Sequence, residues 1–244
     1  MTTDTTTPAG AAPGTAAGPA PVTGATTALE TLTIAKAINR ALADELAADE
    51  KVLLMGEDIG SLGGVYRVTE GLKARFGADR VVDSPLAESG IIGTSIGLAL
   101  RGYRPVAEIQ FDGFVFPGFN QITTQLAKMH ARTRGAATVP VTIRIPYGGG
   151  IGSIEHHSES PEALFAHTAG LRVITPSNAH DAYWMTRQGI RSQDPVIIFE
   201  HISLYNTQGE LTAAAEHVDI DRAAIRRARN RSVFRRPQDG RAVG

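Results

Sequence analysis

Glu88 is the residue whose type and position point most directly to chemistry. It lies where a short apolar run, Val81-Val82, passes through a polar turn into a helix-forming segment that begins near Gly90. A carboxylate at a helix N-terminus interacts with the helix dipole by about 0.3–1 kcal/mol, and this structural role alone could explain it. Its neighbours Pro85-Leu86 and Ile91-Ile92 are apolar, however. A carboxyl group buried among them could share a proton with a ring nitrogen, which is the functional interpretation.

Two later segments carry further candidate groups, one aromatic and one rich in glycine. Gln110 precedes a stretch that holds four of the eight phenylalanines of the chain, Phe114 among them. Such a cluster is more often core, but at the end of a strand it could also form an apolar wall for a flat ring. The glycine-rich segment leads into His156 and His157. Either histidine could act as an acid, a base or an anion-binding group near neutral pH, or both could be solvated loop residues.

The elements that must position these residues are short apolar strands alternating with helical segments. This alternation predicts an α/β fold, a doubly wound and mostly parallel sheet covered on both faces. The strand at 139–145 alternates in polarity, so we expect it near an edge of the sheet. The helix that follows Thr33 should be capped by that residue. Strands are predicted at 52–55, 81–82, 105–109, 139–145, 171–175 and 195–199, and helices at 33–46, 90–100, 117–132 and 178–191.

The carboxyl ends of the predicted strands collect the polar and glycine-rich residues. Ligands of parallel sheets bind at these ends, so Glu57, directly after the first apolar strand, joins the candidates for a bound group. The glycine-rich stretch around it, 56–77, contains neither GxGxxG nor GxxxxGK[ST]. A phosphate cradle is therefore a weak interpretation, and a flexible surface loop is preferred.

Composition excludes several classes of protein. The chain has 24 basic and 25 acidic residues and a net charge of -1, so nucleic acid and membrane surfaces are not expected as partners. It has no cysteine, which excludes disulfides and thiolate chemistry. No apolar run approaches the roughly 20 residues of a transmembrane helix, and a signal peptide is not seen. We expect a cytoplasmic protein.

Three regions follow from the pattern along the chain. Residues 1–27 are nearly all Thr, Ala, Gly and Pro, and they should form a disordered tail because they offer little apolar surface to bury. Residues 28–208 form the α/β domain. Residues 209–244 become rich in arginine and poor in large apolar side chains, so we expect an aberrant tail that holds one short helix at 223–227 and builds no core.

Several ordered motifs in this domain resemble one family. The sequence from about Leu29 to Tyr205 is similar to the beta subunit of the first, decarboxylating component of 2-oxo acid dehydrogenase complexes, of the branched-chain and pyruvate type. The resemblance implies a transketolase-like domain that binds the pyrimidine ring of thiamine diphosphate. It rests on GEDIGSLGGVYRVTEGLKARFG, RVVDSPLAESGIIGTSIGLALRGYRPVAEIQFDGFVFPGFNQI, HHSESPEALFAH and PSNAHDAYWMTRQGIRSQDPVIIFEH.

The resemblance also implies roles for single residues. The glutamate that matches Glu88 hydrogen-bonds N1′ of the aminopyrimidine and favours its imino tautomer, which activates the cofactor. Leu86, Gln110 and Phe114 match positions that line the cofactor ring, although several family members carry tyrosine in place of Phe114. Glu57 is taken as a further cofactor contact.

His157 matches the active-site histidine of the family's beta subunit, which is credited with a role in decarboxylation or in reductive acylation of the lipoyl group. A structural monovalent-cation site of the family maps to a corner where the side chains differ from those of the family. That corner is formed by Gly189, Ser192 and Asp194.

The resemblance further implies partners. The chain has no GDG motif followed at a distance by asparagine, so the Mg²⁺ and diphosphate site is expected on an alpha subunit, within an α2β2 heterotetramer. A lipoyl-bearing acyltransferase core would receive the acyl group. Activity is therefore expected only together with the alpha subunit, and a stand-alone thiamine enzyme such as a transketolase is disfavoured.

Two questions about this function stay open in the sequence. Branched-chain 2-oxo acids are preferred over pyruvate as the expected substrate, on the overall similarity of EIQFDGFVFPGFNQI. A pyruvate dehydrogenase beta subunit is the alternative. The family-like sequence stops near 225–227, which suggests a truncated or frameshifted frame, so a non-catalytic interaction subunit is the rival hypothesis from another class.

Overall fold

A computed structural model describes residues 30–212 and 218–222 of the chain. The predicted tail at 1–27, the short helix expected at 223–227 and most of the expected tail at 209–244 lie outside the described residues. Strands are β1 (Glu30–Thr33), β2 (Val52–Gly56), β3 (Val81–Asp83), β4 (Arg104–Glu108), β5 (Thr142–Tyr147), β6 (Arg172–Ile174), β7 (Val196–His201) and β8 (Gln208–Leu211). Helices are α1 (Ile34–Ala48), α2 (Leu72–Phe76), α3 (Glu88–Leu100), α4 (Ala127–Arg132), α5 (Glu162–Ala166) and α6 (Ala179–Arg191), with shorter helical segments η1 (Asp112–Gly118), η2 (Gln121–Leu126) and η3 (Ile202–Leu204).

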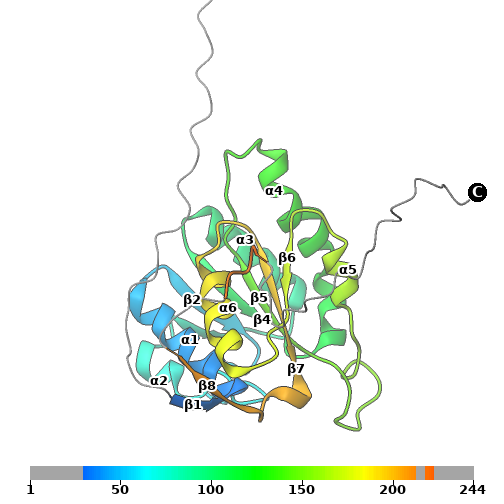
Figure 1. Cartoon of the computed structure of the whole chain (residues 1–244). Helices are drawn as coiled ribbons and strands as arrows, with labels where there is room; N and C mark the ends of the chain where they lie inside the picture. The colour runs from blue at the N-terminus through cyan, green and yellow to red at the C-terminus, as the bar shows by residue number, and fades with distance from the viewer. Residues whose placement is uncertain (1–29, 213–217, 223–244) are drawn as a thin grey trace, which may run out of the picture.

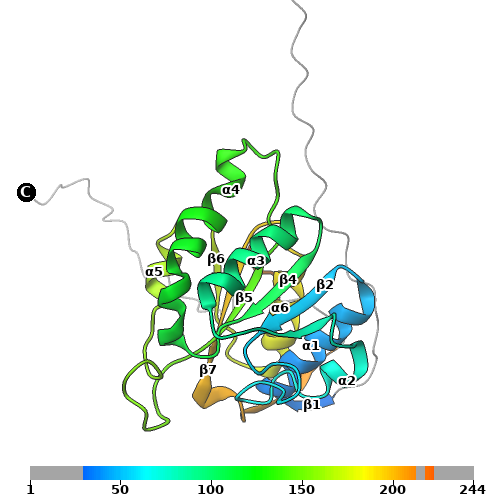
Figure 2. The ribbon, with the colours of Figure 1, turned by 180° about the vertical axis from the view of Figure 1, so that it is seen from behind.

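Six strands form one sheet in the order β3-β2-β4-β5-β7-β6, and every neighbouring pair is parallel. Helices α1 and α6 cover one face of this sheet, and α3 with the segment from η2 to α4 covers the other (Figures 1 and 2). This confirms the predicted α/β fold with a doubly wound parallel sheet. None of the described helices is long and apolar enough to cross a membrane.

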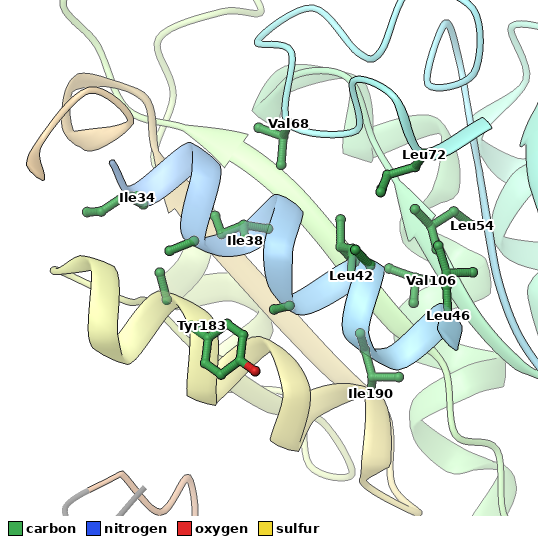
Figure 3. Close-up of a cluster of buried hydrophobic side chains, with 14 of the residues drawn as sticks. Ile34, Ile38, Leu42, Leu46, Leu54, Val68, Leu72, Val106, Tyr183 and Ile190 are labelled. Atoms are coloured by element: carbon green, nitrogen blue, oxygen red, sulfur yellow. The ribbon is translucent and has the colours of Figure 1, made fainter. Parts of the chain in front are cut away.

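Helix α1 shows how the apolar pattern builds one of the two cores. Thr33 caps the helix, and its Oγ1 accepts a hydrogen bond from the backbone N–H of Lys36. Ile34, Ile38 and Leu42 recur on one face and are buried, as predicted. Figure 3 shows these side chains on α1, which lies beside α6 over the sheet, and α6 contributes residues such as Tyr183 to the same cluster.

Strand β5 corrects the expectation of an edge position, because it lies inside the sheet between β4 and β7. Its alternating polarity comes from Arg144, whose side chain is only 1% exposed. The guanidinium is paired with Glu200 on β7 at 2.7 Å and with Glu108 on β4 at 2.5 Å. Arg144 thus faces a buried ion cluster and not water. Alternating polarity in the sequence does not distinguish these two environments.

Two further details differ from the expectation. The predicted helix at 117–132 begins earlier, at Asp112, as the 3₁₀ turn η1, and then contains the π-helical segment η2 before the regular turns of α4. Strand β8 crosses the expected domain boundary at 208 and pairs antiparallel with β1, so that Glu30 lies opposite Leu211. The two ends of the domain are therefore held together in a small sheet of their own.

We predict that Arg144→Met destabilises the domain by about 3–5 kcal/mol, because the substitution leaves two carboxylates buried without their cation. Urea denaturation followed by circular dichroism measures this change. Arg191→Met is the matched control, since Arg191 also pairs with a buried glutamate, Glu45, at 2.8 Å but is itself 30% exposed. We expect about 1 kcal/mol or less for the control. Equal losses in the two variants would contradict the special role of the buried cluster.

Candidate active site

Glu57 and Glu88 are brought together at the carboxyl ends of two adjacent strands. Glu57 follows β2, and Glu88 is the first residue of α3, which comes after β3. Both side chains are buried, with 9% of Glu57 and 6% of Glu88 exposed. The backbone N–H of Ala87 donates a hydrogen bond to the Glu57 carboxylate, so the residue before Glu88 orients its neighbour.

The environment of Glu57 disfavours its charged form. Burial raises the pKa of Glu57 above its ordinary value of 4.5, and the nearby carboxylates of Glu88 and Asp58 raise this pKa further. The hydrogen bond from Ala87 acts in the opposite direction but does not cancel these effects. Within the described residues, Glu57 Oε1 is buried and has no hydrogen-bond partner. A buried polar atom without a partner is rare, and at this place it indicates room for a donor from outside the chain.

The loop between β2 and α2 is packed, in contrast to the surface loop that was expected. Asp83 at the end of β3 accepts hydrogen bonds from the backbone N–H of Gly60 at 2.6 Å and from Lys73 Nζ at 2.7 Å. Thr69 is fully buried, and its hydroxyl donates to the carbonyl of Ile59 at 2.7 Å. These hydrogen bonds fix the backbone of the loop that begins at Glu57.

Gln110 reaches the same loop from the end of β4. Its Nε2 donates to Asp58 Oδ2 at 3.2 Å, so the amide lies beside the carboxyl pair. Asp58 has a positive φ of 57°, a conformation that aspartate tolerates better than most residues. Asp58 is a contact that sequence reasoning missed, although its position directly after Glu57 at a strand end was a signal.

Phe114 and His157 lie in an aromatic cluster around η1. The His157 ring is 4.3 Å from the ring of Phe111 and 5.2 Å from that of Phe114. Adjacent histidines would normally point apart, but His156 has a φ of +64° and its ring also lies near Phe114, at 6.3 Å. Sequence reasoning missed this turn because a positive φ at a histidine has no pattern of its own.

The aromatic cluster and the carboxyl pair belong to one edge of the molecule. Helical segment η1 packs on the start of α3, where a Cβ placed on Gly118 would lie 3.3 Å from the backbone oxygen of Glu88. The loop that carries the histidines extends from the lower edge in Figures 1 and 2. Glu57, Glu88, Gln110, Phe114 and His157 all lie at the carboxyl ends of strands, as expected for a binding edge.

Leu86 was expected to line a cofactor ring, and the structure places it at the surface. Its side chain is 81% exposed, the second highest value among the large exposed apolar residues of the described ranges, after Ile154 at 86%. Leu86 lies in the turn between β3 and α3, next to the carboxyl pair in sequence, but it is not packed with either core cluster. Its role as a ring contact therefore stays a proposal.

Side chains from other parts of the chain reach the expected cation corner. Arg104 Nη1 donates to the carbonyl oxygens of Ile190 and Ser192, each at 3.1 Å, at the end of α6. Asp194 forms ion pairs with Arg172 at 3.5 Å and with His130 at 3.4 Å. These contacts do not test the cation site at Gly189, Ser192 and Asp194, which stays a proposal. The described residues contain no group of three or more His, Cys, Asp or Glu side chains that could hold a metal ion.

The carboxyl pair does fit an aromatic cofactor with hydrogen-bond donors. Glu57 Oε1 is one of four buried side-chain atoms of the described residues that lack a hydrogen-bond partner, and Glu88 lies close enough to raise the pKa of Glu57. Phe114 is only partly buried and offers an apolar surface at the same edge of the sheet. Two carboxyl groups, which accept hydrogen bonds when ionised, and one amide, which also donates, match a nitrogen heterocycle such as an aminopyrimidine, which can both donate and accept.

Comparison with known families decides the classification. The model of the transketolase pyrimidine-binding domain matches residues 30–208, almost the whole described domain. The chain belongs to this family. Its parallel sheet is the fold of the transketolase-like pyrimidine-binding domain.

Curated relatives confirm the resemblance to beta subunits of the first component of 2-oxo acid dehydrogenases. "Pyruvate dehydrogenase E1 component subunit beta" of Leifsonia xyli subsp. xyli is 60% identical over 82% of this chain and 59% of its own length. "3-methyl-2-oxobutanoate dehydrogenase subunit beta" of Mycobacterium tuberculosis is 53% identical over 82% of this chain and 57% of its own length. "Pyruvate dehydrogenase E1 component subunit beta" of Staphylococcus aureus is 48% identical over 82% of this chain and 62% of its own length.

The chain thus spans about 60% of the length of the curated relatives that it matches. Among solved structures, the beta chain described as "Split gene transketolase, inactive beta4 tetramer" superimposes with a TM-score of 0.57 at 19% identity. The match covers 70% of this chain and 51% of the other. At this identity the likeness shows the shared pyrimidine-binding fold.

We predict that Glu57→Gln stabilises the isolated chain at neutral pH. Because the folded state raises the pKa of Glu57 above 4.5, it binds the proton more tightly than the unfolded state. The stabilisation due to the protonated group is complete below pH 4.5 and is lost as the pH rises through the raised pKa. The advantage of the glutamine variant should therefore grow across that interval and then level off.

The measurement for Glu57→Gln is the free energy of unfolding as a function of pH, by urea denaturation from pH 4 to 8. Glu50→Gln is the control, because Glu50 is exposed in the turn before β2. A difference between Glu57→Gln and wild type that stays constant over the whole range would show that Glu57 titrates alike in both states.

We also predict that thermal stability does not depend on the identity of a monovalent cation. The carbonyl groups of Ile190 and Ser192 accept from the guanidinium of Arg104, whose positive charge disfavours a second cation beside them. The midpoint of thermal unfolding should be equal in potassium chloride and choline chloride at the same ionic strength. Arg104→Met should lower the free energy of unfolding by about 1.5–3 kcal/mol, because two buried carbonyls lose a charged donor. Stabilisation specific to potassium in the wild-type chain would contradict this assignment.

Proposed function

We propose that this chain is the beta subunit of the first component of a 2-oxo acid dehydrogenase and binds the aminopyrimidine end of thiamine diphosphate. The observation that carries the proposal is the buried pair of Glu57 and Glu88, in which Glu57 Oε1 lacks a hydrogen-bond partner among the described residues. Family membership and the names of the curated relatives support the same reading.

The residues of the chain would bind and orient the cofactor. Glu88 would hold the aminopyrimidine at its ring nitrogen, and Glu57 would accept a hydrogen bond through Oε1. Gln110, already held by Asp58, would fix the neighbouring edge of the site, and Phe114 would cover the ring and keep water from the carboxyl pair. When bound, thiamine diphosphate supplies a nucleophilic carbon that allows a 2-oxo acid to lose carbon dioxide.

Proton handling in this proposal belongs to the carboxyl pair. Burial raises the pKa of Glu57, and the nearby carboxylates of Glu88 and Asp58 raise it further. Glu57 would therefore hold a proton more readily than an exposed carboxyl group. A carboxyl that keeps or returns a proton at a ring nitrogen is what a change of tautomer in an aminopyrimidine requires.

Two substrates remain in the proposal. The relative named pyruvate dehydrogenase is 60% identical, and the relative named 3-methyl-2-oxobutanoate dehydrogenase is 53% identical. We therefore propose a 2-oxo acid dehydrogenase whose substrate is either pyruvate or a branched-chain 2-oxo acid, with neither preferred. Substrate profiling decides between the two.

The partners in the proposal follow from what the described residues do not offer. Residues that would hold Mg²⁺ and a diphosphate group are expected on an alpha subunit, in an α2β2 assembly. A lipoyl-bearing acyltransferase would accept the acyl group, with His157 assisting at that end of the site. These partners are proposals for the whole enzyme.

We predict that Glu88→Gln lowers the decarboxylation rate by about 10²–10⁴-fold, because the amide does not exchange a proton with the ring nitrogen. The chain is co-expressed and purified with the alpha subunit from the same source. Decarboxylation of pyruvate and of 3-methyl-2-oxobutanoate is then measured with thiamine diphosphate, Mg²⁺ and an artificial electron acceptor.

Glu50→Gln serves as the control for Glu88→Gln and should keep full activity. A chain that binds the alpha subunit but gives an inactive complex would support the rival hypothesis of an interaction subunit. Full activity of Glu88→Gln would remove the assigned role of the carboxyl pair.

A further inference from the structure

Asp112 is a buried carboxylate outside the cofactor pair, and the described structure gives it no cation. Its side chain is 0% exposed. The charged or titratable groups that face it are Glu159 and Tyr66, and the carboxylate of Glu159 raises the pKa of Asp112 in addition to the larger effect of burial. A buried carboxylate that faces another acid is costly unless its oxygens accept enough hydrogen bonds. Its retention therefore requires an explanation.

Three backbone N–H groups satisfy this carboxylate, and they come from three different segments. Asp112 accepts from Gly113 at 2.8 Å, at the start of η1, and from Gly148 at 3.2 Å, just after β5. The third donor is the backbone N–H of Glu159, just before α5. One side chain thus ties both ends of the 148–159 loop to η1. That loop contains the two histidines.

The residue after Asp112 fixes the histidines themselves. The backbone N–H of Gly113 also donates to the carbonyl oxygen of His156 at 3.2 Å. A Cβ at position 113 would lie 2.5 Å from Cα of His156, so only glycine allows this approach. The contact holds His156 at its φ of +64°. It therefore sets the direction in which the next residue, His157, leaves the backbone.

The position of His157 fixes its tautomer. His157 Nδ1 lies 2.7 Å from the carbonyl oxygen of Glu155, which can only accept a hydrogen bond. Nδ1 must therefore carry the hydrogen, and in the neutral ring Nε2 is then unprotonated and able to take a proton. The ring itself is held by edge contacts with Phe111 and Phe114.

We propose that Asp112 is a positioning residue that, with Gly113, holds the 148–159 loop so that His157 keeps its proton on Nδ1 and presents Nε2 as a base. The catalytic meaning of this arrangement rests on the proposed function, but the arrangement itself does not. Asp112 acts through the loop and does not touch the ring. The same arrangement would serve any reaction at this edge that needs a base held in a fixed orientation.

The test reads the tautomer of His157 directly in the full chain, without activity. Nitrogen-15 labelled histidine is introduced, and the ring nitrogen shifts are recorded by nuclear magnetic resonance at pH 8, where histidine is neutral. The His157 signal is assigned by its loss in His157→Gln. In the wild-type chain we expect an unprotonated Nε2 and a protonated Nδ1.

Asp112→Asn should shift the His157 signals toward the other tautomer. An amide replaces one acceptor oxygen by an NH₂ group, which meets backbone N–H donors instead of accepting from them. Gly113→Ala keeps the carboxylate but places a Cβ against His156, and it should produce the same shift. It also keeps the proposal testable if Asp112→Asn does not fold.

Asp83→Asn is the matched control, because Asp83 also accepts from backbone N–H groups but ties a different loop. It should lower the melting temperature and leave the His157 signals unchanged. If Asp112→Asn and Gly113→Ala lower the melting temperature while His157 keeps the wild-type tautomer, the role of Asp112 is structural and the proposal is wrong.

A second readout uses the assembled enzyme with the alpha subunit. Misplacement of a catalytic group by about 1 Å can cost up to 10²-fold in rate, so Asp112→Asn should lower acyl transfer to lipoamide by about 10–100-fold. Because His157 is expected to serve that step, decarboxylation measured with an artificial acceptor should fall less. Equal losses in both steps would contradict the placement of His157 by Asp112. An enzyme inactive in every variant and in the wild type would count against the proposed function and leave the tautomer result standing.

Discussion

The pairing of Arg144 with Glu108 and Glu200 is the constraint on which the binding edge depends. The three residues come from β5, β4 and β7, which are neighbours in the centre of the sheet. Two carboxylates and one guanidinium are held in the interior, where the cost of desolvation is repaid only by close and well-directed hydrogen bonds. The hydroxyl of Tyr205 donates to Glu200 at 2.7 Å and completes the cluster. Any shift of one central strand against another would break these contacts, so the cluster fixes the register of the strand ends that carry the site.

The carboxylates at this edge differ in how many hydrogen bonds they accept from the chain itself. Those with several such bonds hold loops in place, and the one with an unpartnered oxygen is the candidate for binding. Asp112 accepts from three backbone N–H groups, and Asp83 accepts from two and from Lys73. Glu57 accepts from one backbone N–H and keeps a buried oxygen without a partner in the described chain. The first two are complete within the molecule and hold loops in place. The third is incomplete within the described chain, which fits the proposed binding of a group that donates a hydrogen bond to it.

Much of the fold was open to prediction because apolar spacing decides it. The face of α1, the short apolar strands and the position of Glu88 at the start of α3 follow from side-chain types that recur with the period of their element. The interior position of β5 could not be predicted from apolar spacing. The sequence does not show whether a polar residue such as Arg144 is paired inside the sheet or faces water. The occupation of the α6 end by Arg104 and the left-handed backbone of His156 depend on contacts between segments that are far apart in the sequence. Such features are set by the tertiary structure, and local patterns do not record them.

The packing of α1 on α6, together with the pairing of β1 with β8, has a consequence for synthesis on the ribosome. Helix α1 ends at Ala48, and α6 begins at Ala179, about 130 residues later. At translation rates of about 5–20 residues per second, the apolar face of α1 waits on the order of ten seconds for its partner to emerge. During that time Ile38 and Leu42, which are fully buried in the finished domain, have nothing of the native interface to pack against on the side of α6. The first of the described helices is thus completed only when α6 arrives, and its apolar face needs shielding until then.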